Sequence, residues 1–246
     1  MWEEYPQYHI RRNKMKRKSK KYLEVADKVE KGKLYSKAEA IKLAKETSIT
    51  NFDASVELAV RLNLDSKKSD QQIRGALVLP NGIGKTQKVL VIAKGDKAKE
   101  AIEANADYVG EADMIEKIEK ENWFDFDVII ATPDMMVALG KLGKVLGPKG
   151  LMPNPKIGTV TNDIKKAIMD VKKGKIEYRS DKAGNVHVVI GKVSFTEQQL
   201  LENFEAIMEA ILNAKPSGVK GIYIKNIFLS TTMGPSIKLD FMQFDK

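Results

Sequence analysis

Apolar and polar residues alternate near both ends of the chain. In residues 55–65, valine or leucine occupies every even-numbered position, and 237–241 alternates in the same way. A period of two predicts β-strands with one buried and one exposed face, and 222–229 is a further expected strand. Between 200 and 212, apolar residues recur every three or four positions, which predicts a helix with one apolar face. Both ends therefore favour antiparallel α+β structure.

Helix-start and turn signals add detail to these end segments. Ser36 and Glu39 have the spacing of a capping box, and Ser194 and Glu197 repeat it, so a helix is expected to begin at each place. Residues 176–191 predict a β-hairpin, with its turn in the sequence Asp-Lys-Ala-Gly.

The middle of the chain follows a different pattern. Continuous apolar runs at 88–93 and 128–131, with a shorter one at 108–109, alternate with helical segments at 97–104 and 112–120. Apolar strands separated by helices predict a parallel sheet covered on both faces. The glycine- and proline-rich stretch after these elements, 140–158, is expected to be a long loop, and 163–171 a final helix.

This change of pattern predicts an α/β protein with a discontinuous domain. Residues 15–82 and 175–246 are expected to form one α+β domain, and 83–174 an inserted α/β domain. Gly82 and Gly174 are the candidate hinges, because glycine accommodates backbone changes at low cost.

Charge narrows the class of partner. The formal net charge is +9, and residues 1–82 carry +7 of it, from 18 basic and 11 acidic side chains. Such an excess favours a polyanion, either nucleic acid or an anionic membrane surface. Residues 11–21 hold eight basic side chains and no acid, but no amphipathic helix with large apolar residues accompanies them, which disfavours the membrane. The chain has no cysteine, which excludes disulfides and thiol catalysis and fits the cytoplasm.

The first residues differ in composition from the rest. Residues 1–14 are rich in aromatic side chains and show no helical period. Met15 lies inside the basic run, and Arg11-Arg12 fits the translation of a purine-rich ribosome-binding site just upstream of that codon. The hypothesis is that 1–14 is an extension that is not translated in the cell.

A nucleotide-dependent α/β enzyme is the alternative to a binding protein. Residues 81–86 (NGIGKT) resemble the end of a phosphate-binding loop, but Leu79 occupies the place of the loop's first glycine. No dinucleotide fingerprint follows 88–93. The two histidines, His9 and His187, are far apart, so a transition-metal site is not expected. We therefore predict neither a catalytic residue, nor a metal, nor a cofactor.

Three segments are candidates for RNA contacts. The loop 230–236 (STTMGPS) is rich in hydroxyl groups suited to phosphate and ribose, and its glycine allows close approach of a backbone. Phe52 precedes the first alternating strand, where an aromatic ring either fills the core or stacks on a base. Arg179, Asp181 and Lys182 gather at the expected hairpin, where the alternative is an exposed charged turn.

Five segments in order carry a resemblance to one family. They are NFDASVEL (51–58), SDQQIRGALVLPNGIGK (69–85), LGPKGLMPNPKIGTV (146–160), YRSDKAGNVH (178–187) and STTMGPS (230–236). The chain resembles, from about Met15 to Phe241, the bacterial form of the large ribosomal subunit protein L-one family. The resemblance implies a split RNA-binding domain with an inserted Rossmann-like three-layer α/β domain that binds no dinucleotide.

The resemblance also implies partners and contact residues. The expected partner is the mobile stalk of large-subunit ribosomal RNA beside the tRNA exit site, where the protein assists release of deacylated tRNA as a monomer within the cytoplasmic ribosome. Bacterial members also repress their own operon by binding its mRNA. RNA contacts carried over from the family's motifs fall on Phe52, Ser55, Arg179, Asp181, Lys182, Thr232, Met233 and Gly234. Asn51 and Asn226 depart from residues that some members carry, and Asn51 puts one phosphate contact in doubt.

Overall fold

The computed structural model describes residues 19–30, 32–65 and 68–242. The extension 1–14, the expected start at Met15 and most of the basic run 11–21 lie outside these ranges. The fold is mixed α/β, as the sequence predicts. No helix in the described part is long and apolar enough to cross a membrane.

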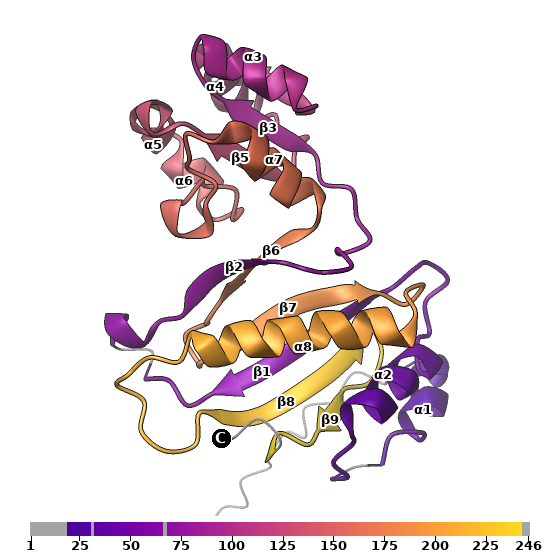
Figure 1. Ribbon diagram of the computed structural model, residues 1–246. Helices are drawn as coiled ribbons and strands as arrows, with labels where there is room; N and C mark the ends of the chain where they lie inside the picture. The colour runs from indigo at the N-terminus through magenta and orange to yellow at the C-terminus, as the bar shows by residue number, and fades with distance from the viewer. Residues whose placement is uncertain (1–18, 31, 66–67, 243–246) are drawn as a thin grey trace, which may run out of the picture.

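The elements follow one another in a simple order (Figure 1). The helices are α1 Lys20–Ala26, α2 Lys37–Glu46, α3 Asp96–Glu103, α4 Ala112–Glu121, α5 Met136–Gly140, α6 Gly143–Leu146, α7 Ile164–Lys172 and α8 Glu197–Asn213, and the 3-10 turns are η1 Ser69–Gln71, η2 Pro133–Met135 and η3 Pro155–Ile157. The strands are β1 Ser55–Leu62, β2 Arg74–Val78, β3 Val89–Ile92, β4 Tyr108–Gly110, β5 Val128–Ala131, β6 Lys175–Arg179, β7 Asn185–Lys192, β8 Ile224–Thr231 and β9 Ile237–Leu239.

The two chain ends share one antiparallel sheet, in the order β7-β1-β8-β9. The even-numbered residues of β1, Val56 to Leu62, are buried, as their alternation predicts. Helix α8 lies across this sheet in Figure 1 and buries Phe204 and Ile207 in the same core. The described residues that flank 83–174 are called the flanking unit below, and 83–174 the middle unit.

One of the two expected capping boxes lies elsewhere. Ser36 and Glu39 cap α2 as predicted. Helix α8, however, begins two residues later than expected, because Thr196 and Gln199 form its capping box. Ser194 instead donates its hydroxyl to the Asp53 carboxylate at 2.7 Å. The nearby carboxylate competes for the hydroxyl that would otherwise cap the helix.

The middle unit has the parallel sheet that its apolar runs predict, in the order β4-β3-β5. Both faces are covered, since Leu90 and Ile92 belong to one hydrophobic cluster and Val89 and Val91 to another. The expectation of a plain loop at 140–158 was wrong in part. This stretch contains the short helix α6 and the turn η3, because its leucines and Ile157 pack inward despite the many glycines.

The expected hairpin at 176–191 was wrong in its pairing. The chain does reverse at the predicted turn, and Ser180 and Val186 form an isolated bridge. Strand β6, however, pairs with β2 in a separate two-stranded sheet, while β7 pairs with β1. Strand β2 was not anticipated, since it lacks an alternating pattern. It pairs closely with β6 because Gly75 leaves room for the ring of Tyr178, whose hydroxyl lies 2.5 Å from where a Cβ would be.

Candidate nucleic-acid interface

The hydroxyl-rich loop 230–236 lies beside the first residue of β1. Thr232 donates its backbone N–H to the Ser55 carbonyl oxygen at 3.0 Å. Its side-chain oxygen accepts the backbone N–H of Ser55 at 3.1 Å. These two bonds, with a longer one from the Thr232 hydroxyl to the Ser55 carbonyl at 3.4 Å, fix the loop to the sheet, although the two residues lie 177 positions apart in the chain. The loop is therefore a rigid feature of this end of the sheet.

The tip of this loop projects into solvent. Met233 is 72% exposed and adopts a left-handed backbone conformation, with φ of 66°. Few residues other than glycine adopt it, and such strained positions often coincide with binding sites. Gly234 has no room for a side chain, because a Cβ there would lie 2.2 Å from Thr231 Oγ1. The backbone at the tip is therefore held in one shape with an apolar side chain on its outside.

Phe52 lies near this end of β1. Phe52 is 62% exposed, so the alternative of a core aromatic is wrong. The next residue, Asp53, accepts the Ser194 hydroxyl and its backbone N–H, which fastens the segment before β1 to the β7–α8 connection. The hydrogen bond from the Ser194 side chain is the main reason that the pKa of Asp53 lies below its usual value. The segment that presents Phe52 is thus anchored directly after the ring.

Lys192 completes this cluster and was missed from the sequence. Its ammonium donates to the Ser55 hydroxyl at 3.0 Å and reaches the Asp53 carbonyl oxygen at 3.4 Å. The signal that could have found it is the strand register, in which Ser55 is the partner of Lys192. Phe52, Ser55, Lys192, Thr232, Met233 and Gly234 are called the loop face below. It combines a cation, hydroxyls, and exposed aromatic and apolar side chains, which is the combination that folded RNA engages.

The remaining predicted residues lie at the other end of the sheet. The turn that carries Asp181 is fastened to the last residue of β1, since Leu62 donates its N–H to the Gly184 carbonyl at 2.9 Å. Thr232 is fastened to the first residue of β1. The loop of Thr232 and the turn of Asp181 are therefore separated by the length of β1, roughly 23 Å at about 3.3 Å per residue. The structure therefore does not gather all the predicted contacts into one cluster. Arg179 and Lys182 are exposed beside this turn.

The Asp181 carboxylate is engaged within its own turn. It accepts the backbone N–H groups of Asn185 at 2.7 Å and Ala183 at 2.8 Å, and the Asn185 side-chain amide at 3.0 Å. The backbone hydrogen bond from Asn185 is the leading reason that the pKa of Asp181 is lowered. His187 Nε2 lies 4.0 Å from the same carboxylate. Asp181 thus shapes the turn that presents Arg179 and Lys182.

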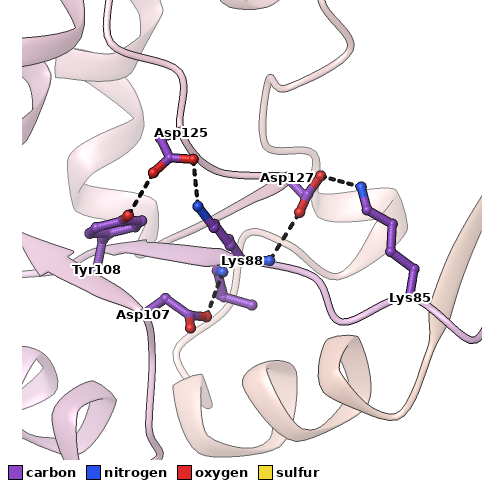
Figure 2. Close-up of polar contacts among 7 residues, drawn as sticks. Lys85, Lys88, Asp107, Tyr108, Asp125 and Asp127 are labelled. Carbon is purple, nitrogen blue, oxygen red and sulfur yellow. Dashed lines mark hydrogen bonds and ion pairs between the residues drawn. The ribbon is translucent and has the colours of Figure 1, made fainter.

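The motif that resembles a phosphate-binding loop serves a structural contact. Residues 81–86 lie in the link between β2 and β3, residues 79–88, and a strand follows them in place of a helix. Lys85, which would bind phosphate, donates to Asp127 at 2.6 Å, and this ion pair lowers the pKa of Asp127 (Figure 2). Beside it, Lys88 binds Asp125 at 2.6 Å. These contacts fasten the end of the link to the middle unit and give no support to the nucleotide-dependent enzyme.

Comparison with known families supplies an independent finding. The model of the Ribosomal protein L1p/L10e family matches residues 44–235, which is 192 of the 246 residues. The match includes both connections between the units and every residue of the loop face.

Proposed function

The chain belongs to the Ribosomal protein L1p/L10e family, a structural family of the large ribosomal subunit that binds ribosomal RNA. From this premise we propose that the protein binds the mobile stalk of the large-subunit RNA through the loop face. In the same proposal, it acts as a monomer within the cytoplasmic ribosome, assists release of deacylated tRNA near the exit site, and represses its own operon by binding mRNA.

The observation that supports the loop face most strongly is the fixed, exposed tip at Met233. Its backbone is held in a left-handed conformation by the bonds of Thr232 to Ser55, so its shape exists before RNA arrives. Preorganised contacts lose little conformational entropy on binding. Phe52 on the neighbouring segment offers a flat ring on which an unpaired base can stack.

Affinity and shape recognition have separate sources in this proposal. Lys192 supplies a cation within the loop face, and the basic run 11–21 supplies more positive charge outside the described residues. Contacts of cations with phosphates make affinity depend on salt, but they are insensitive to sequence. The hydroxyl-bearing loop reads the shape of the folded RNA instead. Arg179 and Lys182 at the opposite end of the sheet would contact a second stretch of the same RNA.

The proposal includes movement of the middle unit, residues 83–174, relative to a flanking domain of 15–82 and 175–246. Two links join the units, and they meet where Gly82 and Gly174 are in direct contact. A Cβ on Gly174 would lie 2.6 Å from Gly82 Cα, so this crossing needs glycine. Both glycines also have positive φ, 67° and 97°. Rotation about these links would change how much of the flanking unit the middle unit covers.

The test is binding of the full chain to a short stalk RNA and to a scrambled duplex of equal length, at two salt concentrations. We expect wild type to prefer the stalk strongly, and Thr232→Ala and Met233→Ala to lose that preference while keeping the salt dependence. Equal binding of both RNAs by wild type would reject the loop face as the recognition element.

The same RNA assay extends to the finer parts of the proposal. An operon-leader RNA that shares the stalk's shape should compete with the stalk, and both should weaken together in Thr232→Ala. Release of deacylated tRNA should slow in ribosomes that lack the protein and recover when it is added back. If Thr232→Ala still bound the operon-leader RNA as wild type does, repression would not depend on the loop face.

A further inference from the structure

Asn203 is a buried polar residue on the apolar face of α8. It is 0% exposed, and its side chain uses both ends of its amide. The oxygen accepts the backbone N–H of Asn81 at 3.1 Å, while the nitrogen donates to the carbonyl oxygens of Gly82 at 3.0 Å and Ile190 at 2.8 Å. A buried and fully bonded amide fixes one arrangement of its partners, because each lost bond would leave a polar group unsatisfied.

These bonds make the start of the first link part of the flanking unit. The Gly82 carbonyl belongs to the peptide group between Gly82 and Ile83, so Asn203 holds that group against α8 and β7. The Asn81 side chain adds a bond to the Glu202 carboxylate at 2.7 Å, also on α8. Rotation at the candidate hinge Gly82 would break the bond from Asn203 to the Gly82 carbonyl, while the bonds of Asn81 stay within the flanking unit.

Beyond Gly82 the link is held less by hydrogen bonds. In the part of the chain that the structure describes, the backbone N–H groups of 83–87 have no hydrogen-bond partner. Ile83 still packs on the core of the flanking unit, and Gly84, with φ of 74°, lies against Phe195 and the stem of Lys192. The next residue, Lys85, binds Asp127 of the middle unit. The boundary between the two sets of contacts therefore lies between Gly84 and Lys85.

We propose that Asn203 is a positioning residue that clamps Gly82 to the flanking unit, so that the first link bends between Gly84 and Gln87. The inference rests on the proposed movement of the middle unit and moves its pivot away from Gly82. The clamp narrows the set of orientations of the middle unit, because fewer backbone torsions remain free. It also places the pivot against Lys192, whose ammonium belongs to the loop face.

The test measures the distance between the units in solution. Because the chain has no cysteine, Glu119→Cys on α4 and Glu209→Cys on α8 place two unique spin labels, both at exposed positions. We expect Asn203→Leu to broaden the distance distribution obtained by double electron–electron resonance. Tyr223→Phe is the matched control, since it removes a buried hydrogen bond to the Ile211 carbonyl within the same unit and away from the links. An unchanged distribution in folded Asn203→Leu would overturn the clamp.

Amide hydrogen exchange of the wild-type chain covers the case in which Asn203→Leu does not fold. The amides of Asn81 and Gly82 should exchange slowly and those of 85–87 rapidly, since only the first two have partners. Equal exchange rates across 81–87 would reject the clamp without any substitution. Failure of the proposed function is distinguishable, because it is read from the preference for stalk RNA, which neither of these measurements uses.

Discussion

Thr232 and Ser55 bind each other through three hydrogen bonds at the end of the sheet. The Thr232 N–H donates to the Ser55 carbonyl at 3.0 Å, and the Ser55 N–H donates to the Thr232 hydroxyl oxygen at 3.1 Å. The Thr232 hydroxyl also donates to the Ser55 carbonyl at 3.4 Å. Both bonds of the hydroxyl depend on the side chain and can be removed without touching the backbone bond. This pair therefore allows the shape of the loop to be tested separately from its presence.

Thr232→Val should weaken binding to stalk RNA. Valine keeps the shape of threonine but leaves the Ser55 N–H without its acceptor, at a cost of about 1–3 kcal/mol, or roughly a 5- to 150-fold loss of affinity if the loop must be held to bind. Thr232→Ser keeps the acceptor and is the matched control, expected to bind close to wild type. Equal affinities of the valine and serine variants, measured by filter binding or calorimetry, would show that the bond does not matter for RNA.

Met233→Gly should distinguish the contribution of the backbone conformation at the loop tip from that of the Met233 side chain. Glycine relieves the left-handed strain, worth about 1–2 kcal/mol, and adds flexibility to the unfolded chain, which offsets about 0.4–1 kcal/mol. Thermal unfolding should therefore show a stability equal to that of wild type or up to about 1.6 kcal/mol higher. RNA affinity should still fall, because the exposed side chain is gone. If affinity stayed at the wild-type value, Met233 would have only a backbone role.

Gly234→Ala and Thr231→Ala should be strongly coupled. A Cβ at Gly234 would lie 2.2 Å from the buried Thr231 hydroxyl, which has no hydrogen-bond partner among the described residues. Gly234→Ala alone should displace the loop, and adding Thr231→Ala should make room for the new methyl group. A double-mutant cycle on the free energy of unfolding should give a coupling of about 0.5–3 kcal/mol. Additive effects on the free energy of unfolding would mean that the loop accommodates the new methyl group by a shift that does not involve Thr231.

Lys192→Gln should change how binding depends on salt. If its ammonium meets a phosphate, neutralising it lowers affinity for all RNAs and reduces the slope of log K against log salt by about one. Lys94→Gln, an exposed position in the middle unit, is the control and should leave the slope unchanged. Thr232→Val should also keep the slope. A slope unaffected by Lys192→Gln would exclude a direct phosphate contact.

Most elements could be predicted from the sequence because their signals are local. The alternation in β1, the apolar runs of β3 and β5, and the spacing in α8 depend on neighbours that the sequence itself shows. Two capping boxes fit the sequence before α8, and the choice between them, like the pairing of β6, could not be predicted, because distant residues decide it. Asp53 takes the Ser194 hydroxyl from 141 positions away, and Gly75 in β2 accommodates the ring of Tyr178.

Only those parts of the candidate site that lie in sequence motifs could be predicted. The segments around Phe52 and Met233 were found through their composition and the family resemblance, and both side chains are exposed. Lys192 was missed because its role comes from the register of two strands, and no local pattern marks it. Asn203 was missed because it interrupts an apolar helix face, where a sequence pattern shows a polar residue but not its three partners.

Asp181 should contribute stability that depends on pH. Its carboxylate accepts hydrogen bonds from Asn185 and Ala183, and the pKa of Asp181 is lowered from its ordinary value of 3.8. A carboxyl whose pKa is lower in the folded state than in the unfolded state stabilises the fold. This contribution is complete when the pH is above the pKa of the unfolded state, and it is lost as the pH falls through the pKa of the folded state. The turn should therefore weaken only in acid, below about pH 3.8.

Asp181→Asn isolates this contribution from the other carboxylates. The free energy of unfolding, measured by urea denaturation at a series of pH values, should be lower for the variant at neutral pH and should approach wild type as the pH falls below 3.8. Asp53 and the remaining acids titrate in both proteins, so their effects cancel in the difference. A difference that stays constant with pH would mean that the charge of Asp181 is not what the turn uses.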